Sequence, residues 1–193
     1  PYTIRIMSRV RQLTPRDRPR VESHLLSLSQ QDRYMRFGYV PSDAQIERFV
    51  ARLDFNQCQL FALTGEQHAL KGLAQLSFAF LDNGVPSAEF AVSVEKRHRR
   101  SGAGLQLWRH AVRRAQRMGV SRLTVYTLAE NAAMQALIAK HRAHIIQVDG
   151  ECVANIQLAP FRAIDWLSCL LEDLGDFLAN PWIDRLPRKG VVR

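Results

Sequence analysis

The hydrophobic positions of this chain follow two different periods. After an alternating stretch that begins at Ile4 and predicts a first strand, apolar residues recur every three or four positions. Thr14-Pro15-Arg16-Asp17 favours a helix start, because a hydroxyl side chain caps the first N–H groups and Pro fits the first turn. Ser42 and Gln45 have the spacing of a capping box and predict a further helix. The N-terminal part is therefore expected to be mainly helical.

From residue 59 the period changes to two, which indicates strands. Alternating stretches with turn residues between them predict three successive antiparallel strands over 60–64, 70–80 and 88–94. The pattern then predicts a helix that ends at Gly119, a strand over 122–128, a helix over 131–141 and a final hairpin over 145–158. The predicted order is strand, helices, three strands, helix, strand, helix and two strands.

The segment between the third of these strands and the next helix has the character of an anion-binding loop. Gly102 and Gly104 let the backbone turn tightly and bring its N–H groups close to a ligand. The first N–H groups of the helix that follows have no partners inside the helix and suit a phosphate. A P-loop is excluded because Leu105-Gln106 follow the last glycine, and a dinucleotide fingerprint lacks its third glycine at Leu107.

The pattern Arg99-x-x-Gly102-x-Gly104, placed after a strand and before a helix, resembles the acyl-coenzyme A diphosphate loop of the GNAT acetyltransferase superfamily. The order of the predicted elements over residues 3 to 158 is also that of the superfamily. The resemblance implies an α+β (α/β) GNAT fold, a mixed, mostly antiparallel central sheet with helices on both faces, in a domain spanning residues 1–160. It implies acetyl-CoA (coenzyme A) as co-substrate and a primary amine as acceptor.

The same resemblance implies which residues contact acetyl-CoA. Val92 and Val94 would lie along the pantetheine arm. The diphosphate would be held by Arg99, Arg100, Ser101, Gly102, Ala103, Gly104 and Leu105. Asn131 matches the superfamily's asparagine that contacts the arm of the co-substrate, and it is equally suited to cap a helix without any ligand.

Glu89 is the candidate catalytic base. A lysine amine is neutral in only about one molecule in a thousand near pH 7.4, so acetyl transfer needs a group that accepts its proton. Glu89 lies in an otherwise apolar strand, where a carboxylate either faces a cleft or pairs with an arginine. Ala88-Glu89-x-Ala91 resembles the strand that carries the base in bacterial protein-lysine acetyltransferases, which makes a protein lysine a slightly better acceptor candidate than a small amine.

The sequence departs from the superfamily at the expected proton donor. Many GNAT enzymes have a tyrosine acid where this chain has Ile138, which leaves water or Tyr126 as the donor. A non-catalytic acyl-CoA sensor or regulatory module is therefore the alternative function. A nucleic-acid-binding protein is a weaker third, since the basic residues lack interleaved aromatic residues.

The net charge and the cysteine content limit the partners and the cellular environment that the sequence is expected to have. The formal net charge of +9 favours anionic partners, and coenzyme A is a sufficient one. Three widely spaced cysteines without a C-x-x-C pair indicate neither a disulfide framework nor a zinc site, and the histidines show no metal-ligand spacing. The absence of a long apolar run argues against a membrane partner. A cytoplasmic protein without a metal is expected.

Residues 161–193 are expected to form a separate C-terminal segment. Apolar residues recur at helical spacing between Ile164 and Asn180 and predict an amphipathic helix followed by a basic tail. This helix would either pack on its own domain or form a homodimer contact.

Overall fold

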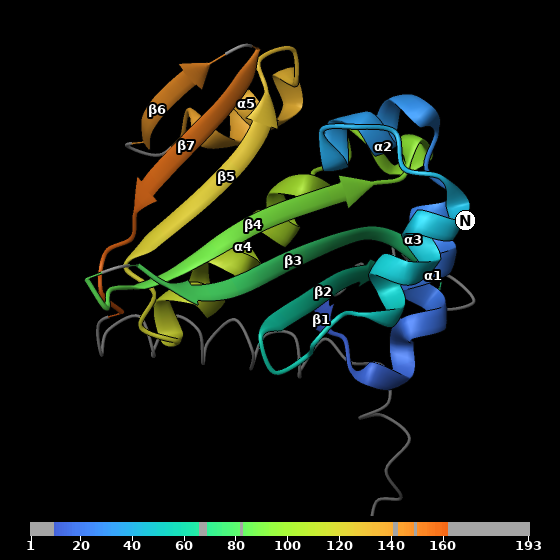
Figure 1. The fold of residues 1–193 in the computed structure, drawn as a ribbon, viewed down its shortest axis with the longest axis horizontal. Coiled ribbons are helices and arrows are strands. Elements are labelled where there is room, and N and C mark those ends of the chain that lie inside the picture. Colours follow the sequence, from blue (N-terminus) through green and yellow to red (C-terminus); the bar gives the residue numbers. More distant parts are fainter. Residues whose placement is uncertain (1–9, 66–68, 82, 141–142, 149, 162–193) are drawn as a thin grey trace, which may run out of the picture. The chain divides into compact units, whose positions relative to one another are not determined.

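The computed structural model describes residues 10–65, 69–81, 83–140, 143–148 and 150–161, and within them seven strands form one sheet in the order β1-β2-β3-β4-β5-β7-β6 (Figure 1). The strands are β1 (Val10–Gln12), β2 (Cys58–Thr64), β3 (Leu70–Phe80), β4 (Pro86–Val94), β5 (Arg122–Leu128), β6 (Ala143–Val148) and β7 (Glu151–Gln157). Neighbouring strands are antiparallel except β4 and β5, which run parallel. The predicted mixed, mostly antiparallel sheet is confirmed.

Helices cover both faces of the sheet, because successive side chains of a strand point to opposite sides. One face carries the 3-10 turn η1 (Pro15–Asp17) and the helices α1 (Arg18–Leu26), α2 (Gln30–Phe37) and α3 (Asp43–Ala51). Val21, Leu25 and Ile46 of this group pack with Leu60 and Leu73 of the sheet. The other face carries α4 (Ala103–Arg117) and α5 (Ala132–Ile138) over a second core that includes Leu107, Trp108 and Phe90.

The predicted helix starts are confirmed at the level of side chains. Thr14 and Asp17 form a capping box at η1, and the Asp17 carboxylate also accepts a 2.6 Å hydrogen bond from Arg11. The Ser42 backbone N–H donates to Gln45 Oε1 at 2.8 Å, and the Gln45 N–H donates to Ser42 Oγ at 3.3 Å. These bonds satisfy N–H groups that a helix leaves unpaired at its start.

Some element boundaries differ from the sequence prediction. The strand predicted over 88–94 begins earlier, at Pro86, because the first position of a strand tolerates a residue without an N–H and the Pro86 carbonyl accepts from Ser121 N–H. The helix predicted over 131–141 is the shorter α5. Most of the predicted first strand and the whole predicted C-terminal helix lie outside the described residues.

The chain divides into two compact units, Pro1–Pro160 and Phe161–Arg193, and the described elements all belong to the first. None of the described helices has the length and apolar character needed to cross a membrane.

Candidate active site

The central feature of the site is a fork between β4 and β5. The two strands pair only from Ser87–Arg122 to Glu89–Thr124, and beyond Glu89 they separate in the part of the chain that the structure describes (Figure 1). The edge of Phe90–Val94 that faces β5 therefore lacks a neighbouring strand and offers backbone N–H and C=O groups to a ligand. The sequence-predicted residues Val92 and Val94 belong to this open edge.

The loop after β4 presents a row of backbone N–H groups. Arg100 and Gly102 adopt left-handed backbone conformations, with φ of 58° and 86°, on either side of Ser101. Within the described chain, the N–H groups of residues 100–105 have no hydrogen-bond partner, and they lie at the N-terminus of the 15-residue helix α4. Alternating left-handed residues next to a helix start form a concave anion-binding arrangement.

The Arg99 side chain, predicted at the diphosphate, is engaged by the protein itself. One of its terminal nitrogens lies 2.5 Å from an oxygen of Asp32 on α2, and its Nε donates to the Val94 carbonyl at 3.1 Å. Asp32 also accepts a 2.8 Å hydrogen bond from Ser29, the residue that caps α2. Arg99 thus connects the loop to the start of α2.

Asn131 caps α5, as one of the two sequence-based interpretations proposed. Its side-chain oxygen accepts a 3.2 Å hydrogen bond from the Met134 N–H. This bond uses the oxygen and leaves the amide nitrogen of the half-buried side chain for other partners. Capping and a contact with a ligand in the fork are therefore compatible.

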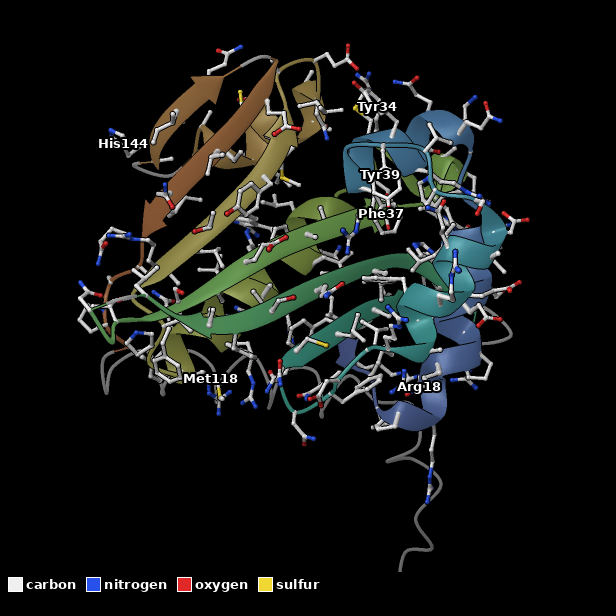
Figure 2. The ribbon with its side chains drawn as sticks, in the orientation of Figure 1. Arg18, Tyr34, Phe37, Tyr39, Met118 and His144 are labelled. Carbon is white, nitrogen blue, oxygen red and sulfur yellow. The ribbon has the colours of Figure 1, made fainter. Side chains whose placement is uncertain are left out.

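Glu89 lies where the strands separate, on the wall of a cleft of about 400 Å³. Its side chain is exposed, and its nearest cross-strand neighbour on β3 is Ser77. The cleft is lined by α2, β3, β4, β5 and β7, with apolar side chains that include Phe37, whose ring centroid lies 6.3 Å from that of Tyr39 (both labelled in Figure 2). The apolar side chains suit the aliphatic stem of an acceptor, and the carboxylates of Glu89 and Glu151, which also line the cleft, suit its amine.

Arg36 of α2 gives the cleft a positive charge beside Glu89. Its guanidinium donates to Gln75 Oε1 at 3.0 Å, and the Gln75 amide donates in turn to Ser77 Oγ at 3.0 Å. Burial lowers the pKa of Arg36 to about 10, while the negative charge of Glu89 acts in the opposite direction. Glu89 therefore both faces a cleft and lies near an arginine, which were the two alternatives for a carboxylate in this strand.

The comparisons with known proteins decide the family. The family model described as Acetyltransferase (GNAT) family matches residues 29–143, which include the fork, the loop and Glu89. The chain belongs to the GNAT acetyltransferase family. It is a GNAT-family N-acetyltransferase, and the family implies acetyl-CoA as its co-substrate. A search of curated proteins gave no match.

Solved structures share this GNAT fold at low sequence identity. The GNAT domain of S. lividans PAT matches with a TM-score of 0.64 and 22% identity, covering 77% of this chain and 89% of that one. A GNAT-family acetyltransferase from Streptococcus pneumoniae matches with a TM-score of 0.59 and 15% identity, covering 78% and 99%. Ribosomal-protein-S5-alanine acetyltransferase from Vibrio fischeri matches with a TM-score of 0.61 and 9% identity, covering 79% and 94%.

One further residue of β5 has a buried polar group without a hydrogen-bond partner among the described residues. Thr127 of β5 is 7% exposed and lines the cleft, yet its hydroxyl has no hydrogen-bond partner among the described residues. A buried hydroxyl without a partner is unfavourable, so a ligand that supplies one is stabilised there.

The position at which many GNAT enzymes have a tyrosine proton donor holds a core residue in this chain. Ile138 is 1% exposed and packs in the core with Met134. Tyr126, in contrast, is 59% exposed and lines the same cleft as Glu89. It follows Thr124, the partner of Glu89, by two positions on β5 and so shares the face of Glu89.

Sequence reasoning missed Arg36, Gln75, Ser77 and Thr127 as cleft residues. Arg36 lies in the Arg33-to-Phe37 stretch, whose spacing alone gives no sign of which arginine faces the sheet. Thr127 reads as an ordinary polar residue of an alternating strand. The described residues contain no cluster of three or more His, Cys, Asp or Glu side chains placed to hold a metal ion.

Proposed function

We propose that this enzyme transfers the acetyl group of acetyl-CoA to the side-chain amine of a lysine in a protein, with Glu89 as the base. The observation that carries the proposal is the position of Glu89 at the opening of the β4–β5 fork and on the wall of the cleft. The pantetheine arm lies along Val92 and Val94, and the diphosphate on the N–H groups of residues 100–105. Asn131 and Thr127 add polar contacts to the arm.

The chemistry then proceeds in two steps. Glu89 accepts a proton from the lysine ammonium, directly or through a water, and the neutral amine attacks the thioester carbonyl. The carbon–sulfur bond of the tetrahedral intermediate breaks, and the thiolate receives a proton from Tyr126 or from water. The nitrogen of the new amide loses its extra proton to that same donor or to water, which restores the donor and leaves a neutral amide and the free thiol. Backbone N–H groups of the open β4 edge stabilise the negative oxygen of the intermediate.

A lysine acceptor is supported by the shape and lining of the cleft. Its walls include Met35, Phe37 and Leu128, which suit a four-carbon stem, while Glu89 suits the amine at its end. The positive charge of Arg36 favours an acceptor that reacts as a neutral amine rather than one held as a cation.

The test is acetyl transfer to lysine-containing peptides, followed by thiol release and mass spectrometry. Glu89→Gln should lower kcat/KM about 10²- to 10⁴-fold at pH 7.4, because a positioned base contributes that much. The difference should narrow toward about pH 10.4, where about half of the lysine is already neutral.

Glu151→Gln is the matched control, since it removes a carboxylate from the same cleft. We expect it to change kcat/KM by less than about tenfold, the lower limit for a catalytic base being about 10². An unaltered rate in Glu89→Gln would remove Glu89 from the mechanism. Binding of acetyl-CoA without transfer to any amine would favour the sensor alternative.

A further inference from the structure

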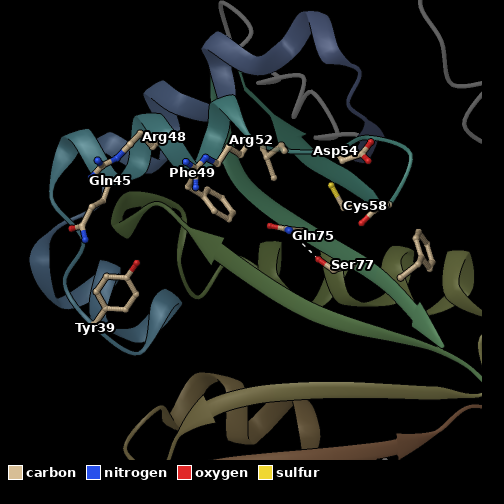
Figure 3. A pocket seen from close by; sticks show the side chains of 12 residues that line it. Tyr39, Gln45, Arg48, Phe49, Arg52, Asp54, Cys58, Gln75 and Ser77 are labelled. Carbon is tan, nitrogen blue, oxygen red and sulfur yellow. Dashed lines mark hydrogen bonds between the residues drawn. The ribbon is translucent and has the colours of Figure 1, made fainter. Parts of the chain in front are cut away.

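A second hollow adjoins the cleft that contains Glu89. It has a volume of about 590 Å³ and shares Phe49, Gln75 and Ser77 with that cleft (Figure 3). Ser77 of β3 is paired with Glu89 of β4 on one side and with Cys58 of β2 on the other, and Cys58 lines the second hollow. Two strand spacings separate Glu89 from Cys58, so the backbones at the two ends lie roughly 10 Å apart.

The second hollow carries two arginines that the protein does not neutralise. Arg48 and Arg52 lie one turn apart on the α3 side of the hollow, both exposed (Figure 3). Arg11 and Arg20, in contrast, form ion pairs with Asp17, and Arg33 forms one with Asp43 at 2.7 Å. Within the described chain no carboxylate forms an ion pair with Arg48 or Arg52.

The hollow nevertheless has one negative group, which limits where an anion would bind. Asp54 lies on its rim and accepts a 2.9 Å hydrogen bond from the Asn56 N–H. The hollow therefore has two positive charges and one negative charge. An anionic group is favoured at the two arginines and disfavoured toward Asp54.

We propose that Arg48 and Arg52 bind an acidic residue of the acceptor protein, next to the lysine that is acetylated. This inference rests on the proposed function. An extended peptide advances about 3.3 Å per residue, so the roughly 10 Å between Glu89 and Cys58 corresponds to about three residues. An acidic residue about three positions from the lysine therefore enters the hollow that Cys58, Arg48 and Arg52 line. The formal net charge of +9 adds a general attraction for an acidic acceptor surface.

The experiment uses three peptides that are identical except at one position. This position lies three residues from the acceptor lysine and holds Asp, Asn or Lys. The wild-type enzyme should acetylate the Asp peptide with a kcat/KM about three- to tenfold above that of the Asn peptide, since two exposed ion pairs contribute about this much. The gain should appear in KM with kcat unchanged, and it should shrink at 0.5 M salt.

Arg48→Gln/Arg52→Gln should abolish the preference for Asp, and Arg48→Glu/Arg52→Glu should reverse it toward the Lys peptide. Arg122→Gln, which removes an exposed arginine at the start of β5, is the matched control and should keep the preference. Thermal unfolding and acetyl-CoA affinity of each variant verify that the fold and the co-substrate site are intact.

Two failures are distinguishable. Equal kcat/KM for the three peptides, or a preference that survives Arg48→Gln/Arg52→Gln, would overturn the role of the arginines and leave lysine acetylation in place. Acetylation of none of the peptides, with acetyl-CoA bound, would overturn the proposed function and this inference together.

Discussion

The buried hydroxyl of Thr127 leads to two predictions for one substitution: a more stable free protein and weaker binding of acetyl-CoA. Its side chain is 7% exposed and its Oγ1 has no hydrogen-bond partner among the described residues. Leaving such a group unpaired costs about 1–3 kcal/mol. Thr127→Val replaces the hydroxyl with a methyl group of similar size, so we expect the free protein to gain about 1–2 kcal/mol in its free energy of unfolding. In a domain of this size that raises the unfolding midpoint by about 2–8 °C.

The same substitution should weaken the binding of acetyl-CoA. A neutral hydrogen bond contributes about 0.5–1.5 kcal/mol, which corresponds to a rise in Kd of about two- to tenfold. Differential scanning fluorimetry without ligand measures the first effect, and isothermal titration calorimetry with acetyl-CoA measures the second. Thr127→Ser keeps the oxygen and should retain most of the affinity.

Thr124→Val is the matched control on the same strand. The Thr124 hydroxyl donates to Asn155 Oδ1 at 3.0 Å, so its removal should lower the unfolding midpoint and leave acetyl-CoA affinity nearly unchanged. A lower midpoint in Thr127→Val would refute the unpaired hydroxyl. A higher midpoint with unchanged Kd would refute its contact with the co-substrate.

Three further predictions concern the loop, its link to α2 and a buried histidine. Gly104→Val should weaken acetyl-CoA binding more than tenfold, because the branched side chain would occupy space that the ligand needs. Little stability should be lost, since a Cβ there would stand 3.9 Å from Val94 Cγ2, an ordinary contact. An unchanged Kd from calorimetry would remove Gly104 from the site. Asp32→Asn breaks the 2.5 Å ion pair with Arg99 and should cost up to about 1 kcal/mol of stability. It should also lower the Kd for acetyl-CoA about two- to fivefold, because the released Arg99 then reaches the diphosphate. A higher Kd would make the role of Arg99 structural. His24 is buried, and burial lowers its pKa below 6.5, so unfolding takes up a proton and stability should fall as the pH drops from 7.5 to 5.5. In His24→Gln the unfolding midpoint should depend less on pH over this range. An equally steep dependence would count against this assignment.

Local signals in the sequence were sufficient for most of the fold. The capping residues Thr14 and Ser42 act on N–H groups within three positions, and a turn glycine affects only its own backbone conformation. Short stretches of sequence therefore carry this information. The mixed, mostly antiparallel sheet was predicted through the family resemblance, whose loop at 99–104 is also a local pattern. Strand ends were less well predicted, because β2 and β4 extend by pairing with distant segments.

The chemistry of the cleft was only partly predictable for the same reason. Glu89 was identifiable as a charged residue in an apolar strand, but its neighbours come from other elements. Arg36 reaches it from α2 and Ser77 from β3, and only the packed sheet brings these residues together. Likewise, Arg99 was predicted from the family pattern to hold a phosphate, while its pairing with Asp32 depends on how α2 packs beside the loop.

The three-pair contact between β4 and β5 has a consequence for how the enzyme behaves in a cell. Three residue pairs join β4 and β5 in the middle of the sheet, and acetyl-CoA, the ligand proposed for the gap beyond them, is consumed in every turnover. Any ligand that binds only the folded form adds to its stability in proportion to the logarithm of its concentration. Resistance of this enzyme to proteases should accordingly rise and fall with the supply of acetyl-CoA, so that the amount of active enzyme follows the metabolic state without a dedicated regulator.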